Sequence, residues 1–199
     1  GFEASVAGAI PIIRTLKQSK TNEDLHSIHG IINGTCNYIL HRMSSENLDF
    51  NDALDEAKKL GYAEADPSFD INGMDAAHKI SILASIAYGK QLPIADIFIE
   101  GIENITTMDI RYANELGYTI KHLGITGFSN NIFECRVHPV LISEKNILSQ
   151  VSGVMNAIIL KGDKFGTSML YGHGAGGPAT ASAVVSDIIE AASFLKNNN

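Results

Sequence analysis

The order of two hydrophobic periodicities constrains the fold of this chain more than any single motif. Helical spacing of apolar side chains dominates the first half of the 199 residues, whereas apolar and polar side chains alternate through much of the second half. Helices followed by strands are typical of an α+β domain, because a sheet must bury an apolar face against another layer. The sequence therefore predicts an α+β domain, with a mixed or antiparallel sheet that is backed by helices and largely exposed on its other face.

Proline, glycine and capping residues mark where most elements begin and end. Thr35 is expected to cap one helix, and Asn51 or Asp52 to cap the next one, which ends at Gly61. Residues 62–73 follow neither period and are expected to form a structured loop. The other expected helices cover residues 11–16, 73–88, 107–123 and 179–195, and the expected strands cover 26–32, 97–99, 133–142, 154–161 and 168–171.

Charge and the length of the apolar runs narrow the classes of function. A formal net charge of −7 argues against nucleic acid or an anionic membrane as a partner. The longest apolar runs fall well short of the roughly 20 residues that a membrane helix needs. Cys36 and Cys135 form no CxxC pair, which is typical of free thiols in a reducing cytoplasm. We therefore expect a cytoplasmic protein without a metal-thiolate site.

One pair of charged residues is placed where it could transfer protons. Asp75 and Lys79 lie four positions apart, so a helix brings them to one face within contact distance. That spacing alone also fits a surface ion pair worth roughly a few tenths of a kcal/mol. On a helical wheel, however, the pair shares its sector with Ile82 and Ile86, away from the polar side around His78. This border between water and core suits a residue for general acid–base chemistry.

Three further patterns leave more than one interpretation open. The acids Glu64, Asp66 and Asp70 would together bind a cationic group, or they form only a solvated turn that begins at Asp66. His26 and His29 make a poor metal chelate, because positions three apart on a strand face opposite sides. Cys36 follows a turn and is expected to be buried, which disfavours a nucleophilic role.

The same region carries a family resemblance. GYAEADP at residues 61–67 and DINGMDAAHK at residues 70–79 closely resemble the signature of homoserine dehydrogenases. Three other stretches agree with that family in order along the chain: EASVAGAIP at 3–11, GIINGTCNYIL at 30–40, and GAGG with TASAVVSD at 174–177 and 180–187. The resemblance spans essentially the whole chain, and the four motifs together are highly specific.

The resemblance implies an oxidoreductase that interconverts L-homoserine and L-aspartate 4-semialdehyde with NAD or NADP, in the pathway to threonine, methionine and isoleucine. Lys79 matches the family's proton-transfer lysine, and Asp75 matches the aspartate that binds or polarises the substrate hydroxyl. Glu64 is expected to bind the substrate ammonium group. The remaining matches, which bind the substrate or shape its pocket, are Asp70, Tyr62 and Gly61.

The resemblance also implies two sites built mainly from backbone. A monovalent cation, such as sodium, would be held by the carbonyl groups of Glu3, Val6, Gly8 and Ile10. The same residues can equally be a tight turn that leads into a helix. Near the other end of the chain, the glycine-rich turn with Gly174, Ala175 and Gly176 would approach the cofactor.

The family's dinucleotide-binding half has no counterpart in this sequence. That half carries a GxGxxG turn after its first strand, whereas nothing like it precedes Glu3, and GHGAGG at residues 172–177 does not have that spacing. We therefore expect residues 1–175 to form the substrate-binding, catalytic and dimerisation domain. Residues 176–199 are expected to form a turn and a helix that pack on the nucleotide-binding domain. The chain alone is expected to be inactive.

A non-catalytic dimerisation module is the alternative from another class. An exposed sheet face bearing Phe133, Val137 and Ile158 would favour such a module. The enzyme interpretation instead predicts an ordered pocket around Glu64 and Lys79. A homodimer is expected under both interpretations.

Overall fold

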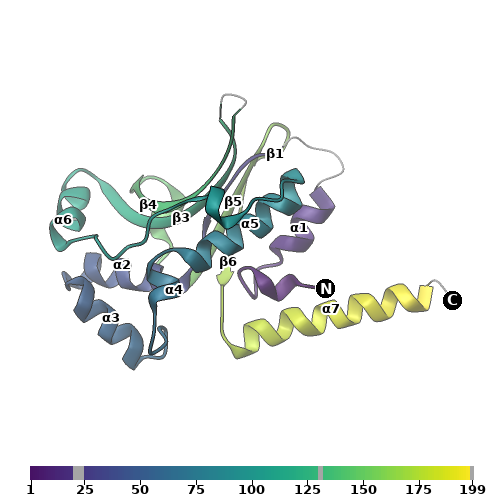
Figure 1. Ribbon diagram of the computed structural model, residues 1–199, viewed down its shortest axis with the longest axis horizontal. Helices are drawn as coiled ribbons and strands as arrows, with labels where there is room; N and C mark the ends of the chain where they lie inside the picture. The colour runs from purple at the N-terminus through teal and green to yellow at the C-terminus, as the bar shows by residue number, and fades with distance from the viewer. Residues whose placement is uncertain (20–24, 130–131, 198–199) are drawn as a thin grey trace.

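The computed structural model describes residues 1–19, 25–129 and 132–197. Its centre is a mixed sheet of six strands in the order β2-β4-β3-β1-β5-β6 (Figure 1). Only β2 runs parallel to its neighbour, and the other pairs are antiparallel. The strands are β1 (Leu25–Ile31), β2 (Phe98–Ile99), β3 (Tyr118–Ser129), β4 (Ile132–Ser143), β5 (Met155–Gly162) and β6 (Gly166–His173). The α+β class with a mixed sheet is therefore confirmed.

Helices lie at one end of the sheet and across one of its faces (Figure 1). They are α1 (Ile12–Ser19), α2 (Gly34–Glu46), α3 (Phe50–Lys59), α4 (Ser68–Ile71), α5 (Met74–Tyr88), α6 (Thr107–Glu115) and α7 (Gly177–Asn197). Three short 3-10 helices are η1 (Glu3–Ser5), η2 (Ile94–Asp96) and η3 (Ile147–Gln150). Among the described residues, no helix has the length and apolar character to span a membrane.

The main core lies between the sheet and the helices α1 and α5. Ile13 of α1 and Leu83 of α5 are buried in one cluster with Val137 of β4 and Ile158 of β5. The exposed face with Phe133, Val137 and Ile158 that would favour a dimerisation module is therefore not found, because Val137 and Ile158 are fully buried. Alternation separates the two faces of a strand, but it does not tell which face the helices cover.

The opposite face of the sheet is also partly buried. Leu123 and Ile159 lie in a second cluster with Leu148 of η3, whereas Met155 and Met169 are only partly covered. The expected largely exposed face is thus closed in part by the segment that contains η3. No periodicity in the sequence indicates this cover, because η3 spans only four residues.

One helix prediction extends too far. Residues 107–123 were expected to form one helix, but α6 ends at Glu115 and β3 begins at Tyr118. Gly117 makes the turn between them with φ +76°. The isoleucine and leucine of residues 118–123 fit either period, and pairing of β3 with β4 along its whole length decides in favour of a strand.

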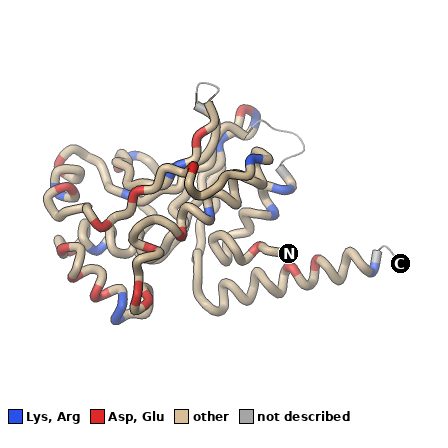
Figure 2. Tube along the Cα trace, viewed as in Figure 1, with Lys and Arg blue, Asp and Glu red and all other residues tan. Residues whose placement is uncertain are grey.

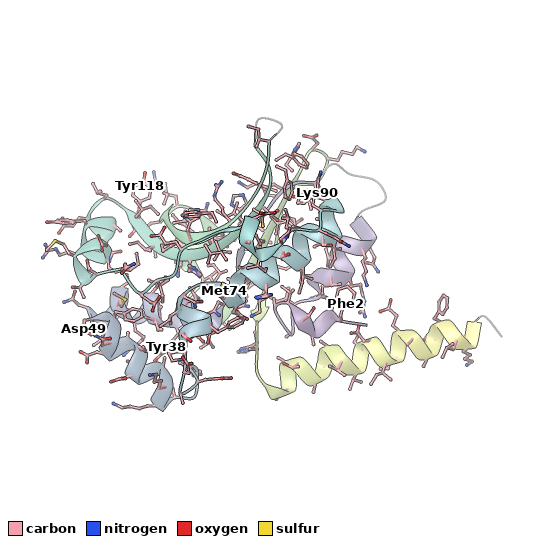
Figure 3. All side chains as sticks on the ribbon, in the orientation of Figure 1. Phe2, Tyr38, Asp49, Met74, Lys90 and Tyr118 are labelled. Atoms are coloured by element: carbon pink, nitrogen blue, oxygen red, sulfur yellow. The ribbon has the colours of Figure 1, made fainter. Side chains whose placement is uncertain are left out.

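Two predicted helix caps are wrong by two or three residues. The N-cap of α2 is Asn33, whose side-chain oxygen accepts a hydrogen bond from the Cys36 backbone NH at 2.8 Å. Asp49 caps α3 in the same way (Figure 3). The predicted loop 62–73 contains the single-turn helix α4. In contrast, α5 begins and ends where the sequence predicts, and Gly89 stops it with φ +67°.

The contact between α5 and β3 should be a main source of stability. A Cβ atom at Gly124 of β3 would lie 3.2 Å from the Cβ of Ile80, and Ile80 is fully buried. We expect Ile80→Ala to lower the free energy of unfolding by about 2–5 kcal/mol, because it opens a cavity under α5. Leu116→Ala, at an exposed position after α6, should cost less than about 0.5 kcal/mol. Urea denaturation measures both, and similar losses would contradict this packing.

Candidate active site

A pocket of about 620 Å³ opens where the end of β1, the start of α2 and the start of α5 meet the glycine-rich turn after β6. Asp75 and Lys79 enter it from α5, and Glu64 and Asp70 enter it from the connection between α3 and α5. Ala175 and Gly176 line its other side. The pocket therefore combines segments that lie far apart in the sequence, residues 33–79 and residues 154–176.

Asp75 and Lys79 form an ion pair inside this pocket. The Lys79 Nζ lies 2.7 Å from the Asp75 Oδ2 and donates a second hydrogen bond to the Ile32 carbonyl at 3.1 Å. Each of the two charged side chains is only 20% exposed. The pair is thus held in place and partly desolvated, which distinguishes it from a freely solvated surface pair. The helix start fixes Asp75, because the Asn72 side chain accepts the Met74 backbone NH at 2.9 Å.

Asn33 is the residue of this site that the sequence analysis missed. Its amide nitrogen donates to Asp70 Oδ1 at 2.7 Å and to Asp75 Oδ2 at 2.8 Å, while its amide oxygen caps α2. The side chain is 5% exposed. One neutral amide therefore holds two carboxylates beside each other, which reduces their repulsion. The sequence analysis gives the cap in this motif to Thr35, although asparagine is an equally common N-cap residue.

The start of α2 also fixes the loop that carries Asp70. The Thr35 hydroxyl donates to the Tyr62 carbonyl at 2.7 Å, and the Cys36 thiol contacts the Asp70 carbonyl at 3.2 Å. Burial raises the pKa of the Cys36 thiol well above its usual value. Cys36 thus has a structural contact and little thiolate character, as expected for a buried cysteine.

The rim of the pocket is acidic and aromatic. Glu64 is exposed there, beside Tyr62, whose ring packs on Tyr38 of α2 at 4.9 Å between centroids. Figure 3 labels Tyr38. Gly61 lines the same rim and adopts φ +74°. Asp66 is not a pocket residue, because its side chain caps the Ser68 backbone NH at 3.1 Å in the turn before α4. Of the two interpretations of these acids, the solvated turn therefore holds for Asp66. Figure 2 shows acidic residues in the segment that follows α3.

The glycine-rich turn packs against the beginning of the chain. The Ala9 backbone NH donates to the His173 carbonyl at 3.1 Å, and a Cβ at Gly8 would lie 3.1 Å from the Gly174 carbonyl oxygen. Val6 and Ile10 are buried in the same segment. The Glu3 side chain caps α1 by accepting the backbone NH groups of residues 13 and 14. The predicted cation and cofactor segments are therefore neighbours.

Comparison with known proteins decides the family. A family model described as homoserine dehydrogenase matches residues 11–189. A homoserine dehydrogenase of Helicobacter pylori is 54% identical over 192 residues, which are 96% of this chain and 46% of that protein. The chain belongs to the homoserine dehydrogenase family.

Solved homoserine dehydrogenases share the fold as well. The enzyme from Thiobacillus denitrificans superposes with a TM-score of 0.92 at 51% identity, covering 94% of this chain and 44% of that one. A hyperthermophilic archaeal homoserine dehydrogenase in complex with NADPH gives a TM-score of 0.82 at 34% identity, covering 97% and 55%. The chain thus spans about half the length of the homoserine dehydrogenases that it matches. The family resemblance of the sequence motifs is confirmed.

The bridging role of Asn33 can be tested by adding a charge. Asn33→Asp keeps an acceptor for the helix cap but places a third carboxylate beside Asp70 and Asp75. We expect a loss of about 2–4 kcal/mol of unfolding free energy near neutral pH. The loss should shrink as the pH falls toward ~4, because the crowded folded site then binds more protons than the unfolded chain.

Asn33→Ser is the matched control, since it also keeps a cap acceptor and adds no charge. Its loss of stability should be smaller and should not depend on pH in this way. Denaturation curves measured across this pH range would contradict the bridging role if the two variants behaved alike.

Proposed function

We propose that this chain is the substrate-binding and catalytic part of a homoserine dehydrogenase that interconverts L-homoserine and L-aspartate 4-semialdehyde. The observation that carries the proposal is the partly buried Lys79–Asp75 pair, which opens on the same pocket as Glu64 and is braced by Asn33. A lysine in such a pair suits proton transfer, and a carboxylate at the rim suits recognition of an ammonium group.

The chemistry follows from what the alcohol must lose. Oxidation of the homoserine hydroxyl to an aldehyde removes one hydride from carbon and one proton from oxygen. NAD or NADP, when bound, supplies the hydride acceptor. In its neutral form, the Lys79 amine takes the hydroxyl proton, and in the reverse direction the Lys79 ammonium returns a proton to the developing alkoxide. Asp75 holds the lysine and the hydroxyl, Glu64 pairs with the substrate ammonium group, and Asp70 and Tyr62 complete the pocket.

The glycine-rich turn fits the approach of a cofactor. A Cβ at Gly176 would meet nothing within 4 Å, and its φ of +111° favours glycine, so its backbone is accessible at the pocket edge. We infer that Gly174, Ala175 and Gly176 contact NAD or NADP, and that residues outside this chain bind the rest of it. We also infer that residues 1–175 form the catalytic unit and that α7 packs on the family's nucleotide-binding domain. The exposed Ile188, Ile189 and Phe194 of α7 support this division.

A monovalent cation, such as sodium, is proposed for the segment of Glu3, Val6, Gly8 and Ile10. Ala7 adopts φ +52° there, so the backbone turns tightly within a buried segment. Backbone carbonyl groups are oxygen donors of the kind that hard cations prefer. The chemistry of this donor set fits such an ion.

We further propose a cytoplasmic homodimer. The interface would be the sheet face that η3 covers in part, because the side chains of Val140, Met155 and Met169 are only partly covered there. Cys36 and Cys135 are free cysteines, in keeping with a reducing compartment.

Removal of the lysine tests the proposed chemistry. In the full-length enzyme, Lys79→Ala should lower kcat for homoserine oxidation by roughly 10²–10⁴, the usual contribution of general acid–base catalysis. Lys145→Ala, at an exposed lysine outside the pocket, should leave kcat unchanged. Residues 1–199 alone should not reduce NAD or NADP. A decrease in kcat smaller than about tenfold for Lys79→Ala would mean that the Asp75–Lys79 pair has only a structural role.

Recognition of the ammonium group can be tested within the acidic loop. Glu64→Gln should weaken L-homoserine binding to the full-length enzyme by about 10- to 100-fold, because it removes the charge from one hydrogen bond. Asp66→Asn removes an acid two residues away that lies outside the pocket lining, and it should leave the affinity unchanged. Calorimetric titration measures both, and equal effects would mean that only the general charge of the loop matters.

A further inference from the structure

Lys121 of β3 is a buried lysine outside the lining of the pocket. It is 2% exposed, and burial lowers its pKa to about 8. Its Nζ donates to the Asn37 side-chain oxygen at 3.3 Å and to the Val151 carbonyl. Within the described parts of the chain, no carboxylate forms an ion pair with it, and the titratable neighbour that senses its charge is His41 of α2. A buried ammonium group without a counter-ion costs stability relative to an apolar side chain.

Asn37 of α2 continues the same network. Its side chain is 1% exposed, and its amide nitrogen lies 3.3 Å from the Val151 carbonyl oxygen, 2.9 Å from that of Gly153 and 3.1 Å from that of Met155. Lys121 and Asn37 therefore bind three carbonyl groups of loop 151–155, which leads into β5 and ends at its first residue, Met155. Gly153 adopts φ +59°, so the loop turns sharply inside this group of donors.

This loop forms part of the pocket wall. Val154 lines the pocket, and its carbonyl oxygen would lie only 2.9 Å from a Cβ at Gly34, the first residue of α2. The next residues of β5 support the glycine-rich turn, since a Cβ at Gly174 would overlap the side chain of Asn156. A displacement of loop 151–155 would therefore move the pocket wall beside Gly34 and the Asn156 side chain that supports the glycine-rich turn. Lys79 and Asp75, in contrast, are fixed by Asn33 and Ile32.

We propose that Lys121 is a positioning residue for the substrate pocket, which together with Asn37 holds loop 151–155 so that Val154 forms the wall beside Gly34. The proposal rests on the proposed function, because it identifies this wall as part of the homoserine site. Lys121 acts on the shape of the pocket and not on the proton-transfer pair. Its loss therefore affects substrate binding more than the chemical step.

The test compares three variants of the full-length enzyme. Lys121→Met removes the donor at similar length, Lys121→Gln keeps a shorter neutral donor, and Lys145→Met makes the same change at an exposed lysine. At a temperature where each variant is folded, Lys121→Met should raise KM for homoserine by about tenfold or more and leave kcat within about threefold. Lys121→Gln should lie between it and the wild type, and Lys145→Met should match the wild type. If Lys121→Met does not fold, an increase in KM for Lys121→Gln supports the positioning role, and an unchanged KM for Lys121→Gln contradicts it.

Hydrogen exchange of backbone amides in residues 151–156 gives a second readout that needs no activity. Faster exchange in this loop for Lys121→Met, with the rest of the sheet unchanged, supports the positioning role. Unchanged KM and unchanged exchange would overturn it, as would a fall in kcat at constant KM. A wild-type enzyme that does not oxidise homoserine would refute the proposed function, whereas the exchange measurement would still decide whether Lys121 holds the loop.

Discussion

The arrangement of the site depends on one buried amide group, that of Asn33. Its oxygen satisfies a backbone NH at the start of α2, and its nitrogen holds the carboxylates of Asp70 and Asp75. Two carboxylates that share one donor group lie close together, and in a partly buried pocket they repel each other unless hydrogen-bond donors lie between them. The amide and the Lys79 ammonium provide those donors. The end of β1, the start of α2 and the start of α5 are thereby held in one arrangement.

Other polar groups extend this control to the walls of the pocket. Thr35 and Cys36, next along α2, hold the loop that carries Tyr62 and Asp70. Asn37, the next residue along α2, and Lys121 of β3 hold the loop before β5. Successive residues of one helix start thus fix separate parts of the site. Buried hydrogen bonds of this kind contribute modestly to net stability, but they select one geometry, because unmade bonds in the interior are costly.

The sequence predicted elements well where local signals and tertiary packing agree. Glycines on both sides of α5 and its apolar stripe gave the correct bounds. The prediction for residues 107–123 failed because Ile120 and Leu123 fit the period of a helix or of a strand, and only pairing with β4 makes residues 118–123 a strand. For a related reason, the sequence does not tell which face of the sheet is exposed. Val137 is inward because α5 lies on that side of the sheet, and alternation is the same for either side.

The sequence by itself determined the α+β class, the family and the contact between Asp75 and Lys79, since these two are four residues apart and the motifs are continuous stretches. Helical geometry alone makes such a pair meet. Only the tertiary structure decided which other groups join them. Asn33 reaches Asp70 and Asp75 across about forty residues, and Lys121 reaches Asn37 across 84. The tertiary structure also distinguished Glu64, which lines the pocket, from Asp66, which lies in a turn two residues away. Contacts between distant segments depend on how helices pack on the sheet, and local patterns in a single sequence carry no record of that packing.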